Sequence, residues 1–169
     1  MPEETLASTA PRSIVRSGES LTGSPIRFIG KEMFLKLADD GTAGSITVLE
    51  DVSPAGSGPP LHAHDFEEWF YVVEGAFLFE ADGTVTQAGV GDFVHVASGI
   101  PHTFQCVSET AGRLLILVRP GGVERYFMEI AAQMMADPAN VAGLAAIGAR
   151  YGVKVLGPPL AARRNGPQP

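Results

Sequence analysis

The chain has 169 residues, a formal net charge of -7 and 45% hydrophobic residues. This length suits one compact domain, and a composition this apolar excludes a disordered chain. The acidic balance would repel a phosphate backbone, so we expect no nucleic-acid partner. The single cysteine, Cys106, has no partner within the chain for a disulfide.

Apolar runs in the chain and the residues at its N-terminus give an expectation for the protein's cellular location. No run approaches the roughly 20 apolar residues of a membrane span, so we expect no membrane partner. The opening residues MPEETLASTAPR lack the basic start and the apolar stretch of a signal peptide. We therefore expect a cytoplasmic protein. Residues 1–25 are rich in Ser, Thr, Glu, Gly and Pro, and this composition predicts a flexible N-terminal arm.

Residues 26–120 consist of short apolar or alternating runs separated by turns that contain glycine. Such runs predict β-strands. Because the connections are too short for parallel crossovers, the strands must pair mostly antiparallel. The sequence therefore predicts an all-β sandwich or barrel, with strands at 26–29, 33–38, 45–52, 68–73, 76–81, 84–87, 92–97, 102–107 and 113–119.

After Pro120 the apolar residues change to helical spacing, which predicts C-terminal helices over residues 121–152. Asp137 is a plausible N-cap of the second helix, because Pro138 would occupy its first position. Gly152 could end that helix. We expect the helices to pack on the barrel or on a second subunit, and residues 153–169 to form an extended tail.

Two histidines and a glutamate form a candidate metal site. In a strand, residues two apart share a face, so His62, His64 and Glu68 could point the same way. His102 begins another predicted strand and could approach them from a neighbouring or facing sheet. Imidazole and carboxylate ligands suit one divalent transition metal, either Fe, Mn, Ni, Co, Cu or Zn. Glu67 has the opposite parity and is expected to face solvent.

The spacing of these residues resembles that of the cupin superfamily. The first cupin motif is matched by Gly56, His62, His64, Glu68 and Gly75, all at the family's spacing. The second motif is matched by Gly91, Gly99 and His102, whereas Ala97 and Cys106 replace a proline and an asparagine that are not metal ligands. The resemblance implies a jelly-roll barrel over residues 26–120 with His62, His64, Glu68 and His102 as metal ligands.

Finer features resemble the single-barrel, quercetin 2,3-dioxygenase-like cupins. They are the run GPPLHAH followed by EWFYVVEG, the run GGVERYFMEI after the last strand, and the late YGVKVLGPPL. This resemblance implies a metal-dependent dioxygenase that cleaves a flavonol-like or other enol-bearing aromatic with O2, and Glu68 would act as general base with a raised pKa. Cupins with the same ligands also serve as non-redox isomerases or as non-catalytic proteins that bind small molecules.

Strand parity also predicts candidate substrate-pocket residues. Phe70, Val72, Phe104 and Cys106 share the faces of the expected ligands, although all four are also good core residues, and their residue types favour the core. His95 either lines the pocket or lies elsewhere on its strand. The expected walls carry no obvious Arg or Lys, which favours an apolar or aromatic small-molecule substrate. A homodimer is expected from the family resemblance and because sheet edges or apolar helix stripes would need covering.

Overall fold

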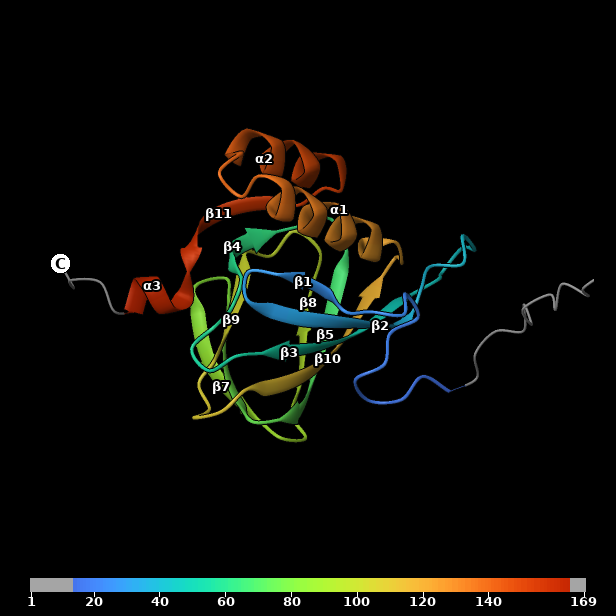
Figure 1. Ribbon diagram of the computed structural model, residues 1–169. Coiled ribbons are helices and arrows are strands. Elements are labelled where there is room, and N and C mark those ends of the chain that lie inside the picture. The colour runs from blue at the N-terminus through green and yellow to red at the C-terminus, as the bar shows by residue number, and fades with distance from the viewer. Residues whose placement is uncertain (1–13, 165–169) are drawn as a thin grey trace, which may run out of the picture.

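The computed structural model describes residues 14–164. Two antiparallel sheets face each other and form a barrel, and two helices lie across one end (Figure 1). Each of the nine sequence-predicted strand runs contains a strand, so the all-β prediction with C-terminal helices is confirmed. Two further strands were not predicted, and both are close to the candidate metal site.

The larger sheet has six strands in the order β1-β2-β3-β10-β5-β8. Its central strand β10 alternates buried and half-buried residues from Gly112 to Val118, which is the period of a strand with one face in the core. The strands of this sheet are β1 (Ile26–Phe28), β2 (Lys31–Leu37), β3 (Thr47–Ser53), β10 (Gly112–Arg119), β5 (Glu67–Glu74) and β8 (Phe93–Val96).

The smaller sheet has five strands in the order β11-β4-β9-β6-β7. Its inward faces meet those of the larger sheet in a core of aromatic and aliphatic side chains, in which Phe70 and Phe77 are almost fully buried. The strands of this sheet are β11 (Lys154–Pro159), β4 (Pro60–Ala63), β9 (His102–Cys106), β6 (Ala76–Ala81) and β7 (Thr84–Gly89).

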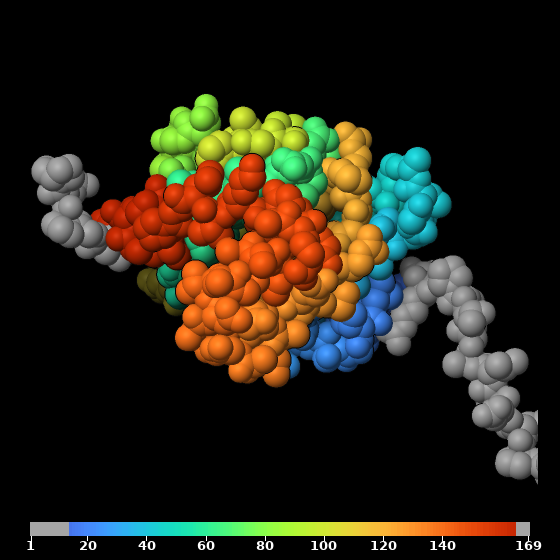
Figure 2. Space-filling view, turned by 90° about the horizontal axis from the view of Figure 1, so that it is seen from above, coloured from blue at the N-terminus to red at the C-terminus, as the bar shows by residue number. Residues whose placement is uncertain are grey.

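The helices α1 (Val123–Ala136) and α2 (Val141–Arg150) form a pair over one end of the barrel. Figure 2 shows this end covered by the orange to red segments of the chain. The prediction that Asp137 caps α2 is wrong. Asn140 is the N-cap and accepts a hydrogen bond from the Gly143 amide at 2.9 Å, whereas Asp137 ends α1. Gly152 follows the last turn of α2 with a φ of 70°, as a helix-terminating glycine does.

The segment expected as a C-terminal tail is part of the barrel. Strand β11 pairs antiparallel with β4, and Val155 lies opposite His62. The short helix α3 (Leu160–Arg164) follows, and the Arg163 guanidinium binds the Glu80 carboxylate through two hydrogen bonds. These contacts join the C-terminal segment to β4 and to β6 of the smaller sheet. Residues 165–169 lie outside the described residues.

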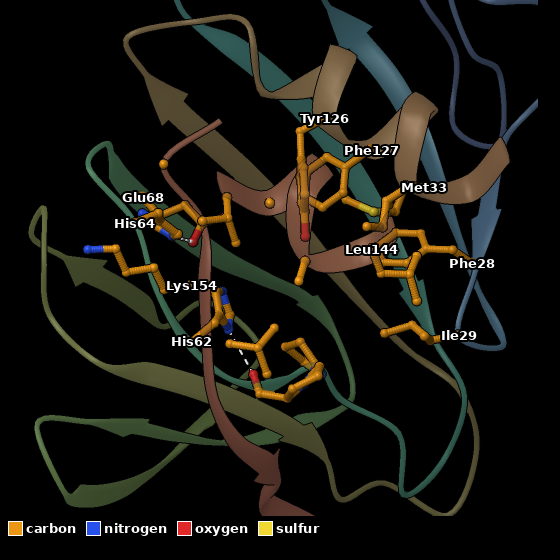
Figure 3. A pocket seen from close by; sticks show the side chains of 18 of the residues that line it. Phe28, Ile29, Met33, His62, His64, Glu68, Tyr126, Phe127, Leu144 and Lys154 are labelled. Atoms are coloured by element: carbon orange, nitrogen blue, oxygen red, sulfur yellow. Dashed lines mark hydrogen bonds and ion pairs between the residues drawn. The ribbon is translucent and has the colours of Figure 1, made fainter. Parts of the chain in front are cut away.

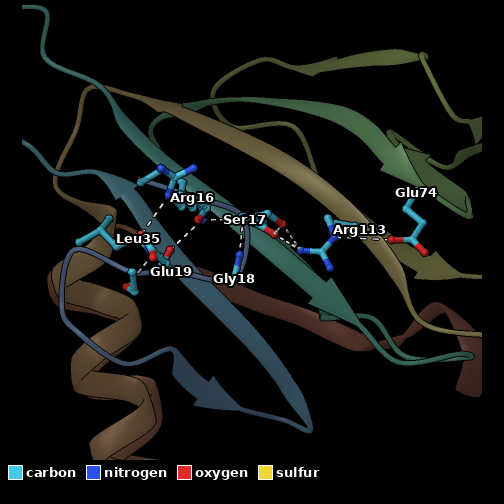
Figure 4. Close-up of polar contacts among 10 residues, drawn as sticks. Arg16, Ser17, Gly18, Glu19, Leu35, Glu74 and Arg113 are labelled. Carbon is cyan, nitrogen blue, oxygen red and sulfur yellow. Dashed lines mark hydrogen bonds and ion pairs between the residues drawn. The ribbon is translucent and has the colours of Figure 1, made fainter. Parts of the chain in front are cut away.

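The N-terminal segment from residue 14 onward is also bound to the barrel, contrary to the expectation of a flexible arm. The Lys36 ammonium donates hydrogen bonds to the carbonyl oxygens of Arg16 and Glu19, both at 2.7 Å. Ser17 donates to Glu50, which also pairs with Arg113 (Figure 4). The segment therefore covers the outer face of β2 and β3. Residues 1–13 of the predicted arm lie outside the described residues.

Among residues 14–164, no helix is long and apolar enough to cross a membrane.

Candidate metal centre

The four predicted ligands come together at the end of the barrel that the helices cover. His62 lies on β4 and His102 on β9, and these two residues are direct partners across the paired strands. Glu68 lies near the start of β5, and His64 lies in the short link between β4 and β5. The four ligand atoms all lie within 4.8 Å of one another. Spacing in the sequence and pairing in the sheet thus bring the same four side chains together.

The link between β4 and β5 holds His64 in a defined orientation. The His64 carbonyl oxygen accepts a hydrogen bond of 2.8 Å from the Gly99 amide, which ties the link to the turn before β9. The Phe66 ring stacks on the imidazole with centroids 3.7 Å apart and an interplanar angle of 10°. The first contact restrains the backbone of His64 and the second restricts its side-chain rotamer, so His64 is held in place before any ligand binds.

Backbone carbonyl groups orient all three imidazoles in the same way. Each Nδ1 atom of His62, His64 and His102 lies 2.8 to 2.9 Å from the carbonyl oxygen of a residue two positions away in the chain. A carbonyl oxygen can only accept a hydrogen bond, so each Nδ1 carries a proton. In a neutral imidazole the Nε2 atom then keeps its lone pair, which is how histidine binds metals.

Glu68 contacts two of these imidazoles through one oxygen. Its Oε2 atom lies 3.0 Å from His64 Nε2 and 3.1 Å from His102 Nε2. Burial alone would raise the pKa of Glu68, but the contacts with His102 and His64 outweigh it and lower this pKa well below its ordinary value. The carboxylate is therefore ionised. The raised pKa that the sequence analysis expected for a base is not found in this arrangement.

The two other resolved pKa shifts in the cluster have opposite directions. Burial and, to a lesser extent, the neighbouring His102 lower the pKa of His62 to about 4, so His62 is neutral at pH 7. Burial also acts to lower the pKa of His102, but the hydrogen bond and charge of Glu68 outweigh this effect and raise it. The cluster thus combines a neutral imidazole with an anionic carboxylate, two of the ligand types that transition metals bind.

The donor set fits one divalent metal ion. The Nε2 lone pairs of His64 and His102 face an ionised carboxylate at hydrogen-bond distance, so a proton or a cation has to lie between each pair of atoms. Three imidazoles and one carboxylate occupy at most four coordination positions. A six-coordinate ion would keep two positions for other ligands, which is typical of catalytic and not of structural sites.

The cluster lies in the wall of a cavity of about 640 Å³ (Figure 3). This volume is in the range of cavities that hold small molecules. The barrel and the helices both contribute to its lining, which is mainly apolar. The aromatic residues that line it are Phe28, Phe66, Phe70, Phe104, Tyr126 and Phe127.

The C-terminal segment covers the cavity. Side chains of α1 and α2, among them Phe127 and Leu144, face the barrel, and β11 passes beside His62 (Figure 3). The apolar stripes of the two helices therefore pack over the barrel end, which is one of the two arrangements expected from the sequence. On its barrel side, Phe127 contacts Phe28 with ring centroids 5.5 Å apart.

The structure places only two of the five candidate pocket residues on the cavity wall. These are Phe70 and Phe104. Val72 and Cys106 share the same strand faces, but they are fully buried in the core and do not line the cavity. Each lies two residues further along its strand. Strand parity gave their face correctly, but it carries no information about depth in the barrel.

His95 does not line the cavity either. It lies on the outer face of β8, where its side chain is 46% exposed and stacks on Trp69 with centroids 5.3 Å apart. Glu67 is on the same outer face and pairs with Arg119 at 2.6 Å. Glu67 and Glu68 therefore point to opposite faces of β5, as the sequence predicted. Glu67 is in contact with a cationic side chain as well as with solvent.

The sequence analysis missed a buried cation in the cavity wall. Lys31 at the start of β2 lines the cavity, and its Nζ atom lies 2.9 Å from Oδ1 of the buried Asp51. Lys154 of β11 also lines the cavity. The expectation of walls without Lys or Arg is therefore wrong. No motif contains Lys31, and the pairing of β2 with β1 and β3 brings it to the site.

Comparison with known proteins relates this arrangement to one family. A family model described as Cupin_2, Cupin domain, matches residues 48–118. Quercetin 2,3-dioxygenase from Bacillus subtilis (strain 168) is 30% identical over 118 residues, which are 68% of this chain and 33% of that protein. The chain thus spans about a third of the length of this curated relative.

Solved structures support the same fold. An RmlC-like cupin from Shewanella frigidimarina matches with a TM-score of 0.51 and 22% identity, over 59% of this chain and 86% of that one. KdgF from Halomonas sp. matches with a TM-score of 0.50 and 16% identity, over 58% and 87% of the two chains. At these identities the likeness concerns the fold alone.

Proposed function

Because the chain belongs to the cupin superfamily and has a single barrel, we propose that it is a metal-dependent dioxygenase acting on a flavonol-like or other enol-bearing aromatic. One observation carries this proposal: three imidazoles and a carboxylate converge within 4.8 Å, and His62, His64 and Glu68 of this cluster line a cavity with aromatic walls. The sequence similarity to a quercetin 2,3-dioxygenase supports the same reaction class.

His62, His64 and His102 would hold the metal through Nε2, and Glu68 would complete the set through Oε2. When bound, the ion would act as a Lewis acid that binds the substrate's enol oxygen and favours its ionisation. The protein's own contribution is orientation, because the carbonyl contacts at each Nδ1 atom fix the imidazoles before the substrate enters.

Glu68 is the proposed proton acceptor. Both histidine contacts involve its Oε2 atom, and Oε1 makes no hydrogen bond with any residue in the described range 14–164. The Oε1 atom can therefore take the proton of the substrate's enol hydroxyl, provided the contacts at Oε2 weaken and let the pKa of Glu68 rise. Dioxygen would then oxidise the electron-rich enolate, and both oxygen atoms of the O2 molecule would enter the products.

The cavity walls favour an aromatic substrate. Phe70 and Phe104 approach each other with centroids 5.7 Å apart beside the ligand cluster, and Phe127 faces them from α1. Burial of an aromatic ring among such side chains is favourable, and it excludes water from the reacting atoms. The small molecule would therefore be held by apolar contacts and oriented by its oxygen atoms.

Oxygen consumption tests the proposal directly. Protein reconstituted with each candidate metal is mixed with quercetin or with a β-diketone, and O2 uptake is compared with anaerobic controls. We expect substrate loss only with O2 and one O2 consumed per substrate. Uptake at background with every metal would refute the dioxygenase proposal, and binding of the same compounds without turnover would instead favour the alternative of a non-catalytic binding protein.

We also propose that the protein forms a homodimer through the outer face of β5 and β8. Tyr71, Val73 and Phe93 are 41%, 42% and 60% exposed there, and Tyr71 is the direct partner of Phe93 across the two strands. Adjacent exposed apolar side chains at a sheet edge are typical of contact surfaces between proteins.

Sedimentation velocity over a wide concentration range tests the dimer. Phe93→Glu should shift the protein to the monomer, because it places a charge within the apolar contact. Val85→Glu is the matched control, since Val85 is 47% exposed on β7, which belongs to the other sheet. A native protein that remains monomeric at high concentration would contradict the proposal.

A further inference from the structure

A buried ion pair lies in the barrel wall beside the ligand cluster. Only 4% of the Lys31 side chain and none of the Asp51 side chain is exposed to solvent. Asp51 is held from the other side by Ser53, whose hydroxyl donates to Oδ2 at 2.6 Å. Burial of two charges is costly, and replacement by apolar residues is often neutral or stabilising. Stability alone therefore gives a weak reason for this pair.

The position of Lys31 relates it to the ligand cluster. Its Nζ atom lies 4.7 Å from the centre of the Phe104 ring. Phe104 follows His102 by two residues on β9, so both side chains point to the same face. The ammonium group therefore lies one layer of side chains further into the barrel than the ligand cluster, and both groups line the same cavity.

The turn between β1 and β2 fixes the start of β2. Ile29 and Gly30 form a two-residue connection between the paired residues Phe28 and Lys31, and their φ values are 45° and 77°. Positive φ at both positions is the requirement of a type I′ hairpin turn. A β-branched residue there is strained, and such strain is concentrated at functional sites. Ile29 also lines the cavity (Figure 3).

The ammonium group retains unused hydrogen-bonding capacity. A lysine has three N–H donors. Within residues 14–164, no atom accepts a hydrogen bond of ordinary geometry from Lys31, and Asp51 Oδ1 is a buried oxygen without such a bond despite the 2.9 Å ion pair. An N–H donor that faces an apolar cavity without an acceptor is unfavourable, so a ligand oxygen at this place would be bound favourably.

We propose that Lys31 binds an anionic oxygen of the substrate, a carboxylate or a phenolate, while the substrate's enol oxygen lies at the ligand cluster. This inference rests on the proposed function, because it assigns a second contact to the substrate of the same cavity. The substrate class is narrowed to aromatic molecules with an enol at one end and an acidic group at the other. Asp51 positions the ammonium and keeps the cavity neutral when no substrate is bound.

Anaerobic titration calorimetry on the metal-reconstituted protein tests this inference without turnover. The probes are 3-hydroxyflavones with a carboxylate at the 2′, 3′ or 4′ position, each compared with the compound that carries a methyl group at the same position. We expect at least one carboxylate to bind about tenfold more tightly than its methyl counterpart, as a charge-assisted hydrogen bond allows.

Variants separate the ammonium from its partner. Lys31→Met alone would leave a buried unpaired carboxylate and strongly destabilise the fold. Lys31→Met is therefore combined with Asp51→Asn, which removes both charges at nearly constant volume. The carboxylate preference should fall to within about twofold in this double variant. Asp51→Asn alone keeps the ammonium and should keep the preference.

The matched control is the second ion pair between the same two strands. Lys36 and Glu50 pair at 2.6 Å on the opposite face of β2 and β3. Lys36→Met with Glu50→Gln should leave the carboxylate preference unchanged. Thermal unfolding confirms that each variant is folded, and elemental analysis confirms that each holds the same metal.

The outcomes distinguish this inference from the proposed function. A carboxylate preference that survives in the Lys31 double variant, an absent preference in the native protein, or no binding of any probe would overturn the role of Lys31. A Lys31-dependent preference without oxygen uptake for any probe would support that role and refute only the dioxygenase. Oxygen uptake without any Lys31-dependent preference would refute only the role of Lys31.

Discussion

The two walls of the cavity are constructed differently. On the barrel side, the ligands on β4, β5 and β9 come from interior strands, each of which is hydrogen-bonded to a neighbour on both sides. On the other side, α1 and α2 cover the cavity mainly through apolar side chains such as Ile130 and Leu144. Sheet hydrogen bonds thus hold the reactive groups, whereas the shape of the cavity depends on packed helices. Substitutions in the two walls should therefore have different consequences.

The largest effect is expected from removal of a histidine ligand in the barrel wall. His102→Ala should lower metal affinity by at least about 100-fold, since even outer partners of metal ligands change affinity by roughly 10- to 100-fold. Competition titration with a chromogenic chelator measures this change. His95→Ala is the control, because His95 lies outside the cavity. Equal losses in the two variants would contradict the assignment.

The second prediction separates proton transfer from metal binding. Glu68→Gln keeps the size of the side chain but cannot accept the enol proton, so kcat should fall by roughly 100- to 10,000-fold. Metal should remain bound through the three histidines, as elemental analysis would record. Glu67→Gln is the adjacent, outward-facing control and should retain activity. Full activity of Glu68→Gln would refute the role of Glu68 as base.

The third prediction concerns the helical cover. Leu144→Ala removes three carbons from the cavity wall, and because this side chain is only partly buried, the loss should weaken substrate binding by about tenfold. KM should rise accordingly while kcat stays within about twofold, because the ligand cluster is untouched. Met135→Ala serves as control, since Met135 is exposed on α1. A large fall in kcat for Leu144→Ala would remove the distinction between the two walls.

The smallest effect is expected at the N-terminus of α2. Asn140→Ala removes the side chain that accepts the Gly143 amide and should lower the free energy of unfolding by about 1 kcal/mol. Urea unfolding followed by circular dichroism measures this change. Asp137→Ala should have a smaller effect, because Asp137 ends α1 and does not cap α2. A larger loss of stability in Asp137→Ala than in Asn140→Ala would instead favour Asp137 as the N-cap of α2.

The ligand cluster was predictable from the sequence because it depends on local spacing. His62, His64 and Glu68 lie close together in the chain at the spacing of the first cupin motif. The single strand that a period of two assumed is not found, because the structure divides these residues between β4, the following link and β5. His102 was recognised because it follows a glycine-containing turn and begins a predicted strand. The depth of Val72 and Cys106 was not predictable, since parity defines a face but gives no position along the barrel axis.

Other features depend on long-range contacts or on competing local signals. Lys31 reaches the cavity only because β2 pairs with β1 and β3, and its partner Asp51 lies within an apolar run that gives no indication of an inward charge. Strand β11 contains two prolines, which argue against a central strand, but an edge strand tolerates them. At the start of α2, the Asp-Pro pair gave a helix-start signal that competed with Asn140.

The central claim is that His62, His64, Glu68 and His102 hold one divalent transition metal. Anomalous diffraction at the absorption edges of Mn, Fe, Co, Ni, Cu and Zn, from crystals of protein purified without added metal, tests it most directly. We predict one strong anomalous peak per chain, about 2.0–2.3 Å from the three Nε2 atoms and the Glu68 carboxylate. A peak bound by other residues, or none at this cluster, would contradict the claim.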